Sequence, residues 1–151
     1  MAHNPVNHPA RPVYRVIAGL TGIYFVIFGV LGVLETSGSE LFAQDDTRVL
    51  GQGTNLGWSA IMALLGVVIL VAAGIGRNVD TRVNQIVAYA FLVLGLAELA
   101  VLRTDANYFN FTVSTCIVAM VSGLVLLMAG MYTKVGTEEE ARAAREARLR
   151  L

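Results

Sequence analysis

Residues 57–75 read GWSAIMALLGVVILVAAGI and contain no charged side chain. A helix rises about 1.5 Å per residue, so roughly 20 apolar residues cover the roughly 30 Å hydrocarbon core of a bilayer. A strand of a membrane β-barrel would be about half as long and would alternate apolar with polar residues. This stretch does neither, and it therefore predicts a helix that crosses a membrane.

Three further stretches of the chain share this length and apolar character. They cover residues 16–34, 84–102 and 112–132. Together with residues 57–75 they predict an all-α fold, an integral membrane four-helix bundle that spans residues 16–132. The links of eight and nine residues before the third and fourth helices are short, so neighbouring helices are expected to run antiparallel.

The composition of the whole chain agrees with a membrane protein. Of its 151 residues, 56% are hydrophobic and 15% are charged, whereas soluble domains have about 45–50% and about 25%. The formal net charge is zero, which excludes the basic footprint of a nucleic-acid-binding protein. The single cysteine, Cys116, lies inside an apolar stretch, and we interpret it as a small core residue.

Two polar segments flank the predicted bundle. Residues 1–15 hold all three prolines and both histidines, which predicts an extended tail. Residues 133–151 are highly charged, and Thr137 with Glu140 three positions later has the pattern of a capping box. This second segment therefore predicts a short charged C-terminal helix.

The basic residues predict the orientation of the chain, because cytoplasmic flanks of membrane helices are enriched in Lys and Arg. Arg48 and Arg103 are the only basic residues on one predicted side of the membrane. We therefore expect a multi-pass protein of the plasma membrane with both termini, and so both flanking segments, in the cytoplasm. The nine basic residues predicted on the cytoplasmic side are Arg11, Arg15, Arg77, Arg82, Lys134, Arg142, Arg145, Arg148 and Arg150.

Small residues in the first two predicted helices are candidates for helix packing, because close approach of backbones drives association in lipid. They have two interpretations, general filler of membrane helices or a contact face for a partner subunit. The candidate packing residues are Ala18, Gly22, Gly29, Gly32 and Gly66.

Glu98 is the ionisable residue that we place inside a predicted span, and a carboxylate in that position is a functional candidate. It lies near the end of its helix and near Arg103. We therefore weigh a structural role, either snorkelling to the membrane surface or pairing with Arg103, against a role in proton-coupled transport.

Three arginines of the C-terminal segment could contact anionic lipid or an acidic protein surface, with a solvated helix as the alternative. They are Arg142, Arg145 and Arg148. No set of residues predicts catalysis, cofactor binding or metal binding. His3 and His8 are too few for a zinc site, the predicted helices hold no histidine for haem, and residues 51–57 are interpreted as a turn.

Three motifs carry a resemblance to a known family. They are Asn4-Pro5-Val6-Asn7-His8-Pro9, Tyr14-Arg15 before the glycine-rich first helix, and Gly53-Thr54-Asn55-Leu56-Gly57-Trp58 at the start of the second. With these motifs the chain resembles a family of small four-span actinobacterial membrane proteins. The resemblance implies an accessory subunit at the periphery of the cytochrome c oxidase part of a respiratory supercomplex, with oxidase or supercomplex subunits and membrane lipids as partners.

Three functions are therefore compared. The first is a non-catalytic accessory subunit without cofactors, which agrees with the absence of recognisable ligand sets. The second is a small homo-oligomeric transporter that uses Glu98. The third is a membrane-bound enzyme or quinone-handling protein, for which the sequence supplies no motif.

Overall fold

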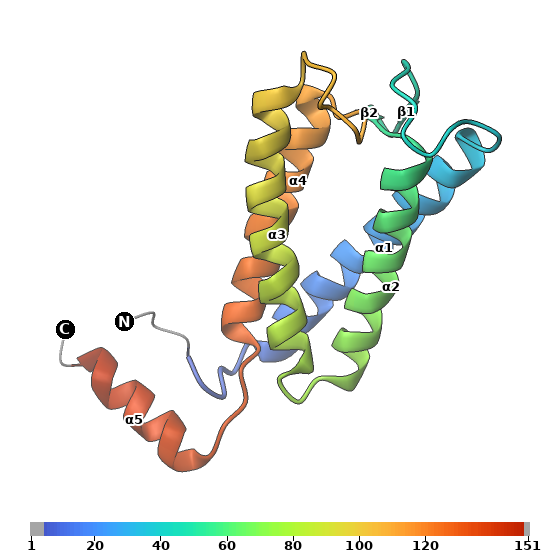
Figure 1. The fold of residues 1–151 in the computed structure, drawn as a ribbon. Helices are drawn as coiled ribbons and strands as arrows, with labels where there is room; N and C mark the ends of the chain where they lie inside the picture. Colours follow the sequence, from blue (N-terminus) through green and yellow to red (C-terminus); the bar gives the residue numbers. More distant parts are fainter. Residues whose placement is uncertain (1–4, 150–151) are drawn as a thin grey trace.

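The computed structural model describes residues 5–149, with side chains up to residue 146. Five helices and one short hairpin make up this part of the chain (Figure 1). In chain order they are α1 (Arg11–Glu35), β1 (Arg48–Val49), β2 (Gln52–Gly53), α2 (Leu56–Ile75), α3 (Val79–Val101), α4 (Val113–Tyr132) and α5 (Glu138–Leu149).

The first four helices form two antiparallel pairs, α1 with α2 and α3 with α4 (Figure 1). Each of these four helices is long and apolar enough to cross a membrane. The all-α membrane bundle predicted from the sequence is confirmed. Helix α5, drawn in red, extends away from the bundle (Figure 1).

Two helices begin five residues earlier than predicted. Helix α1 begins at Arg11, because Pro12 lies in the first turn, where a helix needs no backbone N–H from it. Helix α3 begins at Val79, since its link to α2 is only the turn 76–78. Gly76, Arg77 and Asn78 have φ values of 65°, 51° and 69°, and this left-handed run reverses the chain within three residues.

The candidate packing glycines hold α1 against α2. A Cβ atom built on Gly66 would lie 2.6 Å from the carbonyl oxygen of Gly22, and one on Gly29 would lie 2.6 Å from that of Ser59. A Cβ on Gly32 would collide with the Ser59 side chain. The two helices therefore approach at backbone contact, as small-residue interfaces in membranes allow.

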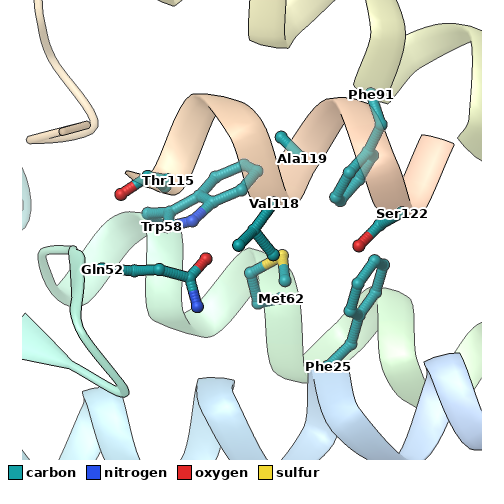
Figure 2. A pocket seen from close by; sticks show the side chains of 9 residues that line it. All are labelled: Phe25, Gln52, Trp58, Met62, Phe91, Thr115, Val118, Ala119 and Ser122. Carbon is teal, nitrogen blue, oxygen red and sulfur yellow. The ribbon is translucent and has the colours of Figure 1, made fainter. Parts of the chain in front are cut away.

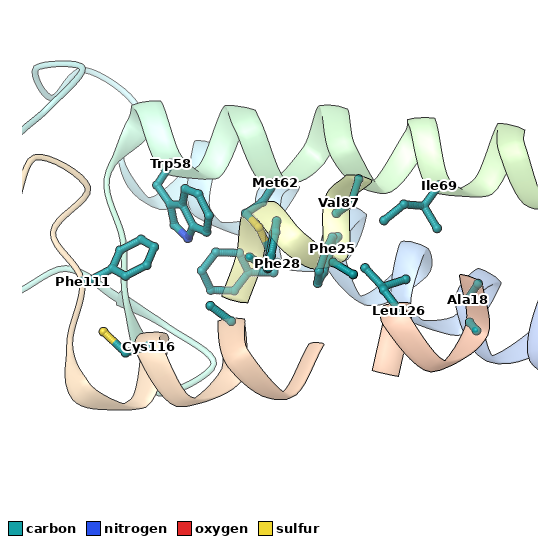
Figure 3. Packing of buried hydrophobic residues seen from close by; sticks show 14 of the residues in the cluster. Ala18, Phe25, Phe28, Trp58, Met62, Ile69, Val87, Phe111, Cys116 and Leu126 are labelled. Atoms are coloured by element: carbon teal, nitrogen blue, oxygen red, sulfur yellow. The ribbon is translucent and has the colours of Figure 1, made fainter. Parts of the chain in front are cut away.

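Aromatic side chains fill the space between the two helix pairs. The rings of Phe25 on α1 and Phe91 on α3 stack with their centroids 5.0 Å apart, and Trp58 on α2 lies 5.9 Å from Phe91. Phe111 packs edge-on against Trp58 at 4.7 Å. Figure 3 shows this cluster continuing from Cys116 to Leu126 and Ala18.

Branched aliphatic side chains cover the outside of the four long helices. Leu20 on α1, Leu64 on α2, Ile86 on α3 and Leu124 on α4 are each more than half exposed. A soluble monomer rarely exposes so much contiguous apolar surface. This surface fits the hydrocarbon interior of a bilayer, and the chain is a multi-pass membrane protein.

Asparagine side chains tie the loops together at the end of the bundle that carries β1 and β2. Asn55 accepts a hydrogen bond from the Trp58 N–H at 2.9 Å, which caps α2, and donates to the Tyr108 carbonyl at 2.7 Å. Asn110 donates to the carbonyls of Asp45 and Thr54 at 2.7 and 2.9 Å. The turn predicted at residues 51–57 is therefore a hairpin followed by a capped helix.

Candidate functional site

A buried carboxylate, Asp80, lies at the opposite end of the bundle, in the first turn of α3. Its side chain has no exposed surface. Two α1 arginines approach its Oδ2 atom, Arg11 through Nη2 at 3.7 Å and Arg15 through Nε at 3.5 Å. A buried charge needs this kind of pairing, because its transfer from water is otherwise costly.

The same two arginines also bind carbonyl groups at the ends of the other helices. Arg15 donates to the carbonyls of Ala73 and Gly74 at the end of α2, the latter at 3.3 Å. Arg11 Nε donates to the Thr133 carbonyl just after α4 at 2.9 Å. The Arg11–Asp80–Arg15 cluster therefore joins all four long helices at this end.

Segments next to the two chain ends form a second layer over this cluster, which we call the terminal junction (residues 7–8, 78 and 133–136). Asn7 and Gly136 exchange two hydrogen bonds, Nδ2 to carbonyl at 2.9 Å and N–H to Oδ1 at 3.1 Å. Asn78 and Val135 also exchange two hydrogen bonds, from Asn78 Nδ2 to the Val135 carbonyl at 2.8 Å and from the Val135 N–H to Asn78 Oδ1 at 2.7 Å. Both segments are therefore bound to the bundle rather than independent of it.

His8 packs inside this junction. Its ring lies edge-on to Tyr132 with centroids 5.0 Å apart, and Tyr132 stacks on Tyr14 at 4.6 Å. Its Nδ1 atom accepts a hydrogen bond from the Ala10 N–H at 3.2 Å. His8 therefore stabilises the start of α1 through packing and hydrogen bonding, while His3 lies outside the described residues.

Glu98 and Arg103 are not brought together. Glu98 faces the interior with 7% of its surface exposed, and its Oε2 atom has no hydrogen-bond partner among the described residues. No ion pair within 4.0 Å joins it to Arg103. Helix α3 ends at Val101, and Arg103 is exposed in the turn that follows.

The candidate packing residues are used within the chain. Ala18, Gly22, Gly29, Gly32 and Gly66 are all buried, and the four glycines face side chains or backbone of the neighbouring helix. They pack within the bundle, which is neither of the two interpretations drawn from the sequence. Because these positions are buried, they offer no free face to a partner.

The C-terminal helix begins as predicted. The Thr137 hydroxyl accepts from the Glu140 N–H at 3.2 Å, and a Glu140 carboxylate oxygen accepts from the Thr137 N–H at 3.0 Å. Arg142 and Arg145 are exposed, and the Arg148 side chain lies outside the part that the structure describes. The capping box thus fixes where α5 starts and leaves both described arginines free for contact.

A narrow gap remains between the two helix pairs (Figure 2). The gap is too narrow to hold the centre of a water molecule. Among the described residues, no three His, Cys, Asp or Glu side chains lie close enough to hold a metal ion. The gap is lined by Phe25, Gln52, Trp58, Met62, Phe91, Thr115, Val118, Ala119 and Ser122.

Residues 15–132 match the protein-family model described as Domain of unknown function (DUF4383). The chain belongs to the DUF4383 family. Comparisons with curated proteins and with solved structures gave no match. The matched DUF4383 region contains Arg15, Asp80 and all four membrane-spanning helices except the first turn of α1. Arg11 and α5 lie outside it.

The Asp80 cluster was not predicted from the sequence of this DUF4383 protein. The third span was predicted to begin at residue 84, which left Asp80 and Arg82 in the link before it. The missed signal is the helical spacing of positions 80, 84, 87, 91 and 98, which are all buried on one side of α3. Such spacing marks a helix face, so Asp80 could have been assigned to the bundle interior.

Proposed function

We propose that this protein is a non-catalytic accessory subunit that assembles with other membrane proteins, at the periphery of the cytochrome c oxidase part of a respiratory supercomplex. The proposal places it in the plasma membrane with both termini in the cytoplasm. Three observations support the proposal. They are the resemblance noted above, the apolar exterior of the bundle, and the ion pairs of Asp80 with Arg11 and Arg15, which occupy these charged groups within the chain.

Helix α5 is the observation that carries the proposal. It has 12 residues and projects from the bundle (Figure 1), and helices of about 12 residues are marginal in water without packing. Its first turn holds three glutamates, and Arg142 and Arg145 are exposed further along. A helix of this kind is suited to dock on a charged surface of another subunit.

Co-purification in mild detergent tests the proposal. The tagged chain is purified from its own membranes beside a control chain that ends at Gly136, which keeps the terminal junction and removes α5. We expect oxidase subunits with the full chain and a severalfold smaller amount with the control. Purification of the full chain without any other membrane protein would contradict the proposal.

Glu98 favours a second candidate, a homo-oligomeric transporter, because its buried carboxylate lacks a hydrogen-bond partner. An interior carboxylate that must gain and lose a proton is a common element of such proteins. The test compares proton flux into proteoliposomes for the native chain and Glu98→Gln. Equal flux would exclude this function, while loss of flux with unchanged thermal stability would support it.

A further inference from the structure

Three exposed cations lie near the Asp80 cluster without an anionic partner. Arg77 is in the turn between α2 and α3, Arg82 is the fourth residue of α3, and Lys134 follows α4 by two residues. All three are exposed. The ion pairs within 4.0 Å among the described residues both involve Asp80, so the charges of these three side chains are available to a ligand. We call them the cation triad.

Hydrogen bonds between α3 and the segment after α4 bring the triad together. Lys134 lies between Thr133 and Val135, and each of these neighbours binds the start of α3. The Thr133 and Thr81 hydroxyls are 3.0 Å apart, and Val135 exchanges two hydrogen bonds with Asn78. Asn78 directly follows the first arginine of the triad, and Thr81 directly precedes the second. Residues far apart in sequence thus form one cationic patch.

The triad lies where the apolar spans end. Helix α2 ends at Ile75 and α4 ends at Tyr132, each two residues before a member of the triad, and α3 begins at Val79. These helix ends lie at the same end of the bundle (Figure 1). Helices of about 20 residues match the thickness of the hydrocarbon core. The triad is therefore level with the headgroups of the lipids that surround the bundle.

Exposed apolar side chains adjoin the triad on the side of the hydrocarbon. Ile75, two residues before Arg77, is 54% exposed, and Ile86, one helical turn after Arg82, is 69% exposed. A cationic patch that continues into apolar surface matches a molecule with an anionic head and hydrocarbon chains. A soluble anion would use the cations alone and would leave this adjoining surface without a function.

The charges near the triad favour an anionic lipid over a zwitterionic one. Asp80 is enclosed and already pairs with Arg11 and Arg15. The next carboxylates along the chain are those of the first turn of α5, where Glu140 binds the Thr137 N–H. A choline headgroup would add a further positive charge beside three cations, whereas arginine binds phosphate oxygens through paired N–H donors.

We propose that the cation triad binds the phosphate group of an anionic phospholipid, whose acyl chains lie along the exposed apolar surface that begins at Ile75 and Ile86. Basic pockets between membrane helices bind the headgroups of such lipids in other proteins. The proposal goes beyond the accessory role and does not depend on it, because the site is made by this chain alone.

Native mass spectrometry of the purified full chain in mild detergent tests the proposal. The chain is titrated with phosphatidylglycerol and, for comparison, with phosphatidylcholine that has the same acyl chains. We expect phosphatidylglycerol to bind about tenfold more tightly. Arg77→Asn, Arg82→Gln and Lys134→Gln should each weaken its binding about fivefold. Asparagine is used at position 77 because it tolerates the φ of 51° there.

A matched control removes two cations from the other end of the bundle. Arg48→Gln combined with Arg103→Gln, both at exposed positions, should leave the binding of phosphatidylglycerol unchanged. Inorganic phosphate at millimolar concentration should not displace the lipid. Equal binding of the two lipids, an equal loss in the control variant, or displacement by phosphate would each overturn the proposal.

Thermal unfolding without added lipid shows that the variants are folded. Each single variant is expected to unfold at the temperature of the native chain. If Arg77→Asn unfolds earlier, Arg82→Gln decides the question, because its side chain is exposed on a regular helix. Undiminished lipid binding by a folded Arg82→Gln would overturn the proposal. The accessory role is tested separately, since binding to the purified chain requires no oxidase subunit.

Discussion

At the scale of single residues, the α1–α2 contact depends on glycines that face backbone atoms of the other helix. Gly29→Ala places a methyl group against the Ala63 N–H and the Ser59 carbonyl, which cannot move without displacing α2. We expect a loss of about 1–3 kcal/mol of stability, typical of an overfilled interface. Thermal unfolding in detergent measures it, with Gly74→Ala as the control, because nothing lies within 4 Å of that site.

Asp80 carries a second prediction at this scale. Asp80→Asn leaves Arg11 and Arg15 without a carboxylate, and breaking a fully buried pair costs about 3–5 kcal/mol. The two arginine side chains are 24% and 31% exposed, so water offsets part of the loss. We therefore expect the free energy of unfolding to fall by about 1–3 kcal/mol.

Denaturant or thermal unfolding of Asp80→Asn tests this value. Asp105→Asn, at an exposed position, is expected to change little and serves as the control. Combining Asp80→Asn with Arg15→Gln should cost less than the sum of the single changes, because both remove the same pair. Simple additivity would show that the pair does not contribute.

At the scale of elements, Asn55 has two separable roles, the cap of α2 and the bridge to two loops. Asn55→Asp keeps the acceptor for the Trp58 N–H but loses the donors to Ala43 and Tyr108. Asn55→Ala loses both, and we expect it to be less stable than Asn55→Asp by about 1 kcal/mol, the usual value of a cap. Equal unfolding temperatures for the two variants would contradict this division of roles.

The long helices could be predicted from the sequence because hydrocarbon imposes a length and an apolar composition on every span. Gly22, Gly29 and Gly66 could also be recognised as packing residues, since few other side chains permit backbone contact. The start of α3 was missed, because charges near a helix end look the same in a loop and in a buried ion pair. The helical spacing that Asp80 shares with positions 84, 87 and 91 was the sequence feature that could distinguish the two, and the contacts of Asp80 with α1 settle the question.

The contacts of the terminal junction were equally beyond prediction. Asn7 and Gly136 are 129 positions apart, and neither local composition nor helical spacing links such distant residues. The charged composition of α5 and its capping box are local, and this is why they could be identified from the sequence.

At the scale of the whole molecule, the terminal junction should protect the segment after α4 from proteolysis. Asn7→Gly and Asn78→Gly remove the side-chain bonds to Gly136 and Val135, and glycine tolerates their positive φ values of 55° and 69°. We therefore expect trypsin to cut after Lys134 several times faster in the double variant. Cleavage after Arg142 should not change, and mass spectrometry of timed digests compares the two sites.

The contact between Arg11 and Thr133 spans 122 positions of sequence and has a consequence for how the protein is made. A ribosome adds about 5–20 residues per second, so roughly 6–24 s pass between synthesis of the first partner and the second. Asp80 becomes available to both arginines before that interval ends, but the carbonyl of Thr133 does not. Closure of the bundle around Arg11 is thus a late event of biogenesis, and a nascent chain stalled before the fourth span would present an unfinished bundle to quality-control proteases.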